Sequence, residues 1–169
     1  STAFMAKVMS EFLPAGVFNV VCGERETGRA LVEHETPAMV SITGSVRAGM
    51  DVAGTAAKQV KRVHLELGGK APVVVFDDAN LENAAEGIAL AGFFNAGQDC
   101  TAATRVLVQA GVYDEMVALL SDQAKNKIAI GMPSEDVLVG PLNNANQMTS
   151  VSGFVDRAPS HARVMAGGS

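Results

Sequence analysis

The chain has 169 residues, of which 48% are hydrophobic, so it can bury a core in one domain or in parts of two. Its formal net charge is −5 and its basic residues are scattered singly, so we expect no nucleic-acid partner. No apolar run approaches the ~20 residues that span a membrane, and residues 1–13 mix charged and apolar positions, unlike a signal peptide. We therefore expect a cytoplasmic protein that does not associate with membranes.

Helix and strand signals alternate in the first part of the chain. Apolar residues recur at spacings of three and four within residues 4–13, which predicts a helix that stops at Pro14. The next segments read as strand, helix and strand, at residues 17–23, 26–34 and 38–43. Two strands separated by a helix of this length indicate a right-handed parallel βαβ unit.

The same alternation continues to the end of the chain. A helix is expected through about residue 60, and the stretch "ELGGK", Glu66–Lys70, is the best domain boundary. The segment 71–76 is too apolar for an edge strand. The further expected elements are strands at 63–67 and 105–109 and helices at 81–94, 112–127 and 148–157. The chain starts without Met and stops after a strand-like "ARVMA", so we expect an internal fragment.

The stretch "TGSVRAG", which follows the strand 38–43, has the form of a phosphate site. Gly44 and Gly49 permit close approach of a ligand to the backbone, Ser45 offers a hydroxyl, and a helix N-terminus supplies free N–H groups. The alternative is a tight strand-to-helix turn without a ligand, because the full GxGxxG and Walker patterns are absent.

Glu66 is a candidate base. It ends a strand-like run between apolar Leu65 and Leu67, and burial there would suit it to accept a proton from water. A sharp Gly-Gly bend follows, which tends to aim a strand-end side chain into a cleft. The alternative is a carboxylate on a solvated face.

Cys100 is a candidate nucleophile, with small and polar neighbours in "NAGQDCTAATR". A short helix that starts near it would stabilise its thiolate. Asp99 would disfavour the thiolate if it pointed at the sulfur, and we expect it to point into a pocket instead. The alternative for Cys100 is a small buried hydrophobe, the role expected for Cys22. The spacings of cysteines and histidines predict neither a metal site nor a disulfide framework.

Three motifs occur in a fixed order: "VSITGS", "LELGGKAP" and "NAGQDC", with Glu66 and Cys100 34 positions apart. Together with "LPAGVFNVVCG" and "GPL", they make nearly the whole chain resemble the NAD(P)-dependent aldehyde dehydrogenases. "NAGQDCTA" is most similar to the aminobutyraldehyde and betaine-aldehyde branch. The resemblance implies a three-layer αβα fold. Residues 1–67 would then be the C-terminal part of an NAD(P)-binding domain, and residues 68–169 the N-terminal part of a catalytic domain.

The resemblance also assigns roles to residues. It makes Cys100 the nucleophile and Glu66 the base that activates water for thioester hydrolysis. Cys100 would form a thiohemiacetal and then a thioester with an aldehyde, and a nicotinamide would take the hydride. The implied cofactor-binding positions are Gly44, Ser45 and Gly49 beside the pyrophosphate, Gly28 on a nearby loop, and the carbonyl of Leu67 near the nicotinamide.

The implied cofactor is NAD, with NADP as an alternative, and the implied assembly is a homodimer or homotetramer. Asp99 would either pair with the amine of an amino-aldehyde such as 4-aminobutanal or cap the following turn. The family's oxyanion asparagine and ribose-binding residues fall outside residues 1–169, so we expect the isolated chain to be inactive. Two rival functions are an acylating, coenzyme A-dependent dehydrogenase, which a base at Glu66 disfavours, and a non-catalytic scaffold protein.

Overall fold

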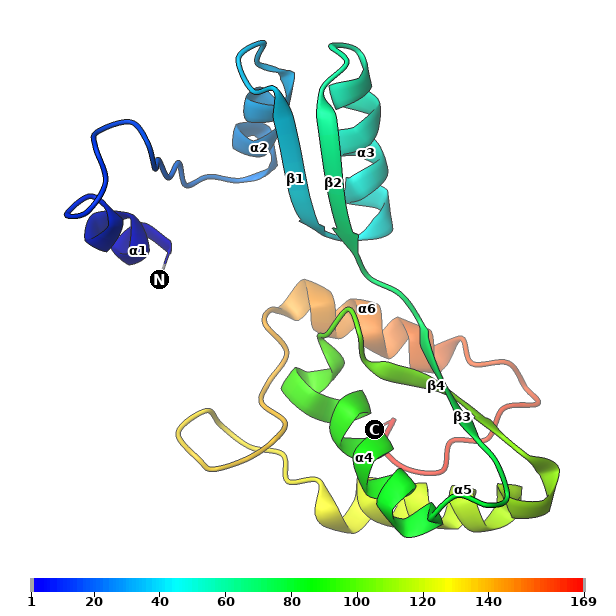
Figure 1. The fold of residues 1–169 in the computed structure, drawn as a ribbon. Helices are drawn as coiled ribbons and strands as arrows, with labels where there is room; N and C mark the ends of the chain where they lie inside the picture. Colours follow the sequence, from blue (N-terminus) through cyan, green and yellow to red (C-terminus); the bar gives the residue numbers. More distant parts are fainter. Residues whose placement is uncertain (1, 169) are drawn as a thin grey trace. The chain divides into compact units, whose positions relative to one another are not determined.

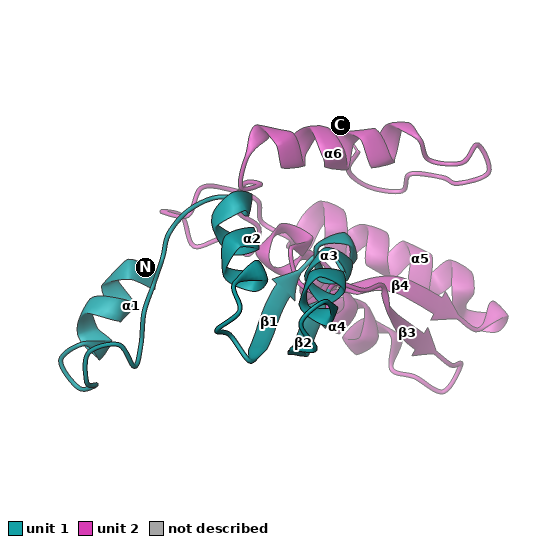
Figure 2. Ribbon diagram, turned by 90° about the horizontal axis from the view of Figure 1, so that it is seen from above, with its two compact units in different colours: residues 1–67 teal, residues 68–169 magenta. Residues whose placement is uncertain are grey.

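The computed structural model describes residues 2–168, which fall into two compact units. The first unit comprises residues 1–67 and the second residues 68–169 (Figure 2). Each unit combines helices with one two-stranded parallel sheet, in agreement with the predicted α/β class. The division falls between Leu67 and Gly68, and the assignment of the two segments to cofactor binding and catalysis stays a prediction.

The first unit is built around strands β1 and β2 (Figure 1). Its elements are α1 (Thr2–Met9), α2 (Arg25–Glu33), β1 (Met39–Gly44), α3 (Val46–Ala57) and β2 (Arg62–Leu67). The strands are parallel, with Met39 opposite Arg62 and Gly44 opposite Leu67. Helix α3 packs on both strands and α2 packs on α3. The carboxyl ends of both strands therefore lie next to the start of α3.

One buried cation joins the end of α2 to the sheet. Lys61 is only 8% exposed, and its Nζ donates hydrogen bonds to the carbonyl oxygens of Val32, at 2.6 Å, and His34. These carbonyls belong to the last turn of α2, where intrahelical partners run out. The bonds fix the end of α2 beside the start of β2.

The βαβ unit exists, but its elements differ from the prediction. Residues 17–23 form no strand, and Val17 and Val21 are 63% and 76% exposed. A β-branched run becomes a strand only where a neighbour takes its backbone hydrogen bonds, and none of the described strands pairs with this run. The parallel pair is instead β1–α3–β2. The first helix also ends at Met9, and turns occupy the rest of the predicted segment.

The second unit has a sheet of β3 and β4 with helices packed on it (Figure 1). Its main elements are β3 (Ala71–Val75), α4 (Leu81–Phe93), β4 (Ala103–Val108), α5 (Tyr113–Asp122) and α6 (Ala145–Asp156). The core consists of Val75, Leu81, Ala85, Ile88 and Met116. Asn80 begins α4, because its Oδ1 accepts the backbone N–H of Asn83 at 2.9 Å.

Three expectations for this unit need correction. The strand predicted at 71–76 is too apolar to be expected at the edge of a sheet, yet β3 pairs only with β4 among the described strands and is an edge strand. Val74 and Phe76 are accordingly 55% and 60% exposed. Residues 162–166 form no strand. The segment 112–127 is α5 followed by a π-helical turn over 123–127. Across residues 2–168, no helix is both long and apolar enough to cross a membrane.

Candidate active site

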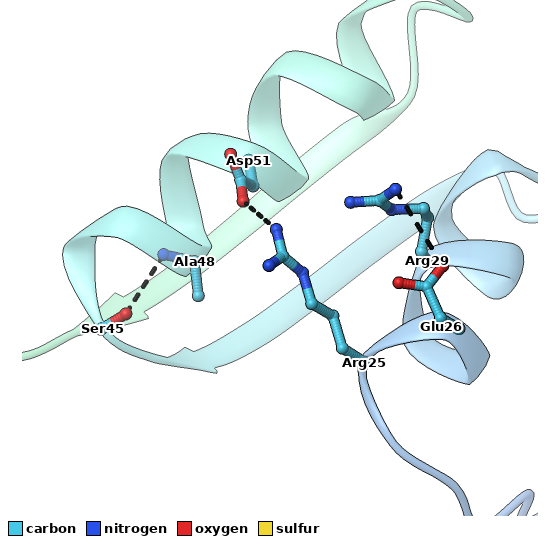
Figure 3. A network of polar contacts seen from close by, with 6 residues as sticks. All are labelled: Arg25, Glu26, Arg29, Ser45, Ala48 and Asp51. Carbon is cyan, nitrogen blue, oxygen red and sulfur yellow. Dashed lines mark hydrogen bonds and ion pairs between the residues drawn. The ribbon is translucent and has the colours of Figure 1, made fainter.

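Ser45 forms the N-cap of α3, directly after β1. Its backbone is extended, and its Oγ accepts the N–H of Ala48 at 3.2 Å (Figure 3). A helix start leaves its first N–H groups unpaired and carries positive potential. Ser45 satisfies one of these groups, and the N–H groups of Val46 and Arg47 stay available for an anion. The predicted strand-to-helix turn is therefore chemically suited to a phosphate.

The two glycines of this turn play different parts. A Cβ built on Gly49 would lie 2.6 Å from Cδ2 of Leu67, so Gly49 allows α3 to pack closely on this side chain of β2. This contact is a second reason for glycine at position 49, and the expected approach of a ligand to Gly49 stays a prediction. A Cβ on Gly44 would meet only ordinary contacts at 3.8 Å with Ile42. The absence of a side chain at Gly44 is compatible with a ligand close to the backbone.

A cavity of about 630 Å³ lies in the first unit, lined mainly by residues of α2, α3 and β1. Gly28 lines it, and no atom lies within 4 Å of where a Gly28 Cβ would stand. Arg25 on α2 pairs with Asp51 on α3 at 3.1 Å (Figure 3). Neighbouring Arg29 approaches Glu26 at 4.0 Å. The cavity thus has a polar rim, and Gly28 keeps part of its wall open.

Glu66 lies near the carboxyl end of β2, one residue before Leu67. Its side chain is 60% exposed, so the expected burial between apolar neighbours is wrong. The reason is strand alternation: Leu67 faces Gly49 of α3, and Glu66 therefore points to the opposite face of the sheet. There its Oε1 lies 2.8 Å from Nε2 of His64. An exposed carboxylate at a strand end is accessible to water, as a base must be.

Cys100 lies in a turn between α4 and β4. The turn is closed by the N–H of Ala102, which donates to the carbonyl of Asp99 at 3.3 Å, and Cys100 is exposed. No helix starts there, so the expected helix dipole at the thiol is wrong: β4 begins at Ala103 and leaves no room for a helical turn. Cys22 is exposed as well, which corrects its expected core role.

Three consecutive left-handed residues precede this turn. Asn95, Ala96 and Gly97 have φ of 52°, 57° and 73°. This backbone conformation costs free energy at a non-glycine residue and persists only where surrounding interactions stabilise it. Here the Asn95 side-chain amide donates to the carbonyl of Gln98 and the Gln98 side-chain amide donates to the carbonyl of Asn95, both at 3.1 Å. This reciprocal pair fixes the chain on its way to Cys100.

Asp99 caps the turn around Cys100. Its Oδ1 accepts the backbone N–H of Thr101 at 2.7 Å and the Thr101 hydroxyl at 2.8 Å. These bonds, the backbone one foremost, hold the pKa of Asp99 below its usual value, and a hydrogen bond from the Cys100 side chain adds to them. The carboxylate thus caps its own turn through Oδ1, and the expected pairing of Asp99 with a substrate amine stays a prediction.

The structure groups the candidate residues into two sets. Gly28, Gly44, Ser45, Gly49, Glu66 and Leu67 belong to the first unit, and Asp99 and Cys100 to the second. Within the second unit, a Cβ on Gly69 would lie 4.0 Å from the carbonyl oxygen of Cys100, so the "GGK" segment runs beside the turn. Among residues 2–168, no three metal-ligating side chains gather into a possible metal site.

Sequence reasoning missed two side-chain pairs. His64 stands two positions before Glu66 on one strand, and this spacing places both on one face, so the signal was present. Arg25 and Asp51 are 26 positions apart on different helices, and nothing in the sequence marks them as partners.

A family model settles the relationship of the chain to known proteins. The model of the aldehyde dehydrogenase family matches residues 1–169. The chain belongs to this family. It is 47% identical over 168 residues to the lactaldehyde dehydrogenase of Escherichia coli (strain K12), an alignment that covers 96% of this chain and 35% of that protein. It is 43% identical over 158 residues to betaine aldehyde dehydrogenase 1 of Rhizobium meliloti (strain 1021), covering 92% and 32%.

Solved structures of the family confirm the α/β fold. The NAD-dependent aldehyde dehydrogenase of Sinorhizobium meliloti matches with a TM-score of 0.95 and 40% identity, over 99% of this chain and 34% of that chain. The chain therefore spans about a third of the length of the relatives that it matches.

Proposed function

We propose that a protein containing this chain oxidises an aldehyde to the carboxylic acid with NAD, and that Cys100 is the nucleophile. The observation that carries this proposal is the exposed Cys100 in a turn that its own bonds hold, within a chain matched throughout by the family model. Because the chain spans about a third of its relatives, the proposal concerns the protein that also has the remaining regions. In it, residues 1–67 contribute to cofactor binding and residues 68–169 to catalysis.

The first unit fits a dinucleotide. The N–H groups at the start of α3 and the Ser45 hydroxyl suit a pyrophosphate, and Gly44 carries no side chain beside them. The cavity of about 630 Å³ that Gly28 lines has room for further parts of the cofactor. The carbonyl of Leu67, at the end of β2, is proposed to face the nicotinamide. Gly49 supports this site by letting α3 pack on Leu67.

In the proposed mechanism, the Cys100 thiolate attacks the aldehyde carbon and forms a C–S bond. NAD, when bound, supplies the acceptor for the hydride of that carbon. Glu66 then takes a proton from water, the water oxygen attacks the thioester carbonyl, and the C–S bond breaks to return the thiolate. The backbone N–H of Cys100 is proposed to stabilise the oxyanion.

The proposed substrate is an aldehyde with a cationic group, such as 4-aminobutanal. Two features support it: Asp99 is an exposed, ionised carboxylate next to Cys100, and a relative is named for betaine aldehyde, which is a cation. Both bonds from Thr101 end on Oδ1 of Asp99, so its second oxygen is the one proposed to meet the cation. Another relative is named for lactaldehyde, which is uncharged, and this makes an uncharged substrate the alternative.

The two cysteines provide a matched test of the nucleophile. Cys100→Ala is expected to abolish aldehyde oxidation, because the covalent route is lost, whereas Cys22→Ala at the other exposed cysteine is expected to keep it. Steady-state NADH formation measures both variants. Full turnover by Cys100→Ala would refute the assignment.

A comparison of 4-aminobutanal with butanal tests the substrate class. If Asp99 pairs with the amine, Asp99→Asn should lower kcat/KM for 4-aminobutanal selectively, by about tenfold or less for an exposed pair. An equal loss for both aldehydes would mean that Asp99 acts only as a cap. The expected homodimer or homotetramer rests on the family resemblance and is checked by light scattering. The cytoplasmic location expected from the sequence is checked by cell fractionation.

A further inference from the structure

His64 and Glu66 form a pair on the face of the β1–β2 sheet that points away from α3. They stand two positions apart on β2, so strand alternation places both side chains on one face. Nε2 of His64 lies 2.8 Å from Oε1 of Glu66. With the carboxylate as the acceptor, Nε2 of His64 is the donor of this bond. The imidazole is therefore held as a donor to one named oxygen of Glu66.

The other described polar side chains on this face make no hydrogen bond to the Glu66 carboxylate. Thr43 stands opposite Glu66 and Ser41 opposite His64 in the strand register, and Arg62 shares the face on β2. None of these side chains donates a hydrogen bond to the Glu66 carboxylate, and within residues 2–168 the His64 ring is the only hydrogen-bond partner of this side chain. One oxygen of this largely exposed carboxylate, Oε1, is thus hydrogen-bonded, and Oε2 has no hydrogen-bond partner among the described residues.

We propose that His64 is a positioning residue that holds Oε1 of Glu66 and thereby presents Oε2 to the water that hydrolyses the thioester. This inference rests on the proposed function, in which Glu66 is the base. A glutamate with 60% of its side chain exposed would otherwise sample several rotamers, and only some of them aim an oxygen at one point. A hydrogen bond at Oε1 narrows this set without using the oxygen that accepts the proton from water.

Three substitutions test the role of His64 in the complete enzyme. His64→Leu removes the donor and should lower the rate of thioester hydrolysis, and with it kcat, by about threefold to tenfold, with acylation unchanged. His64→Gln restores an N–H donor and should recover most of the rate. Arg62→Leu removes another polar side chain from the same face and should leave the rate unchanged. Equal rates in wild type and His64→Leu, or equal losses in His64→Leu and His64→Gln, would overturn the proposal.

Two further measurements separate this inference from the proposed function. In the 169-residue chain, the Nε2–H signal of His64 in nitrogen-15 spectra should move when Glu66 is replaced by Gln, and no movement would show that the bond is absent. In the complete enzyme, Glu66→Gln should slow thioester hydrolysis. If it does and His64→Leu does not, only the inference fails. If Glu66→Gln leaves hydrolysis unchanged, the proposed base is wrong and the inference falls with it.

Discussion

Ser45 begins a helix of 12 residues that packs on two strands, whereas Cys100 sits in a short turn that leads directly into β4. The cofactor side of the proposed site thus rests on regular elements, and the nucleophile rests on irregular backbone. At Ser45 the geometry comes from helix–strand contact, including Gly49 against Leu67. At Cys100 it comes from local bonds made by Asn95, Gln98 and Asp99.

This difference separates two ways to place a reactive group. A helix start offers several N–H groups in fixed directions, which suits a large anion that stays bound. A short turn held by its own hydrogen bonds exposes one side chain, which suits a nucleophile that must reach a carbon atom. The two regions should therefore respond differently to substitution. The first should be sensitive to larger side chains, and the second to changes in the backbone conformations that a residue can adopt.

The largest expected effect is at Gly49. Gly49→Leu places side-chain atoms where Leu67 already lies, with the first clash at 2.6 Å, and should lower the free energy of unfolding of the first unit by about 2–3 kcal/mol. Gly54→Leu on the same helix is the control, because no atom lies within 4 Å of its Cβ position. Hydrogen exchange of the α3 and β2 amides measures both. Equal protection in the two variants would mean that α3 does not depend on this contact.

A smaller effect of opposite sign is expected at Ala96. With φ of 57°, Ala96 carries strain that glycine lacks, so Ala96→Gly should stabilise the second unit by about 1 kcal/mol. Ala91→Gly, in helix α4, should destabilise it by about the same amount. Tyr113, the only tyrosine in a chain without tryptophan, reports the unfolding of this unit in urea by fluorescence. Destabilisation by both substitutions would contradict a strained turn.

The smallest effect concerns the titration of Asp99. Hydrogen bonds from Thr101 lower its pKa, so the cap stabilises the folded turn above the usual aspartate pKa of about 4 and is lost as the pH falls through the lowered value. Thr101→Val removes the hydroxyl and keeps the backbone N–H, so the pKa should rise part of the way to its usual value. Thr101→Ser keeps the hydroxyl and should titrate like wild type. Carbon-13 spectra of the Asp99 carboxyl follow all three proteins.

Regular elements were predictable from the sequence where their signals are local. Helix α4 is predicted over 81–94 and runs over Leu81–Phe93. The prediction succeeds because the apolar spacing of the helix and the bend at Asn95 both depend on residues close in sequence. Ser45 at the start of α3 was likewise visible as a strand-to-helix turn. The strand predicted at 17–23 is wrong because a strand needs a neighbouring strand to pair with, and the sequence of the segment alone does not show whether one is present.

Side-chain environments at the candidate site were less predictable. Apolar Leu65 and Leu67 suggested a buried Glu66, but alternation along β2 sends Glu66 to the other face. The left-handed Asn95 and Ala96 carry no clear sequence signal, since asparagine alone of the two tolerates this conformation well. The exposed turn at Cys100 in place of a helix follows from the early start of β4 at Ala103, a register that depends on pairing with β3.

The central claim, that Cys100 forms a thioester and Glu66 drives its hydrolysis, is tested most directly by rapid mixing of Glu66→Gln enzyme with aldehyde and NAD. We expect a burst of NADH close to one equivalent per active site, followed by slow turnover, because acylation persists while hydrolysis is impaired. The Cys100→Ala enzyme should show neither burst nor turnover. Wild-type steady-state turnover by Glu66→Gln, or a burst from the Cys100→Ala enzyme, would contradict the account.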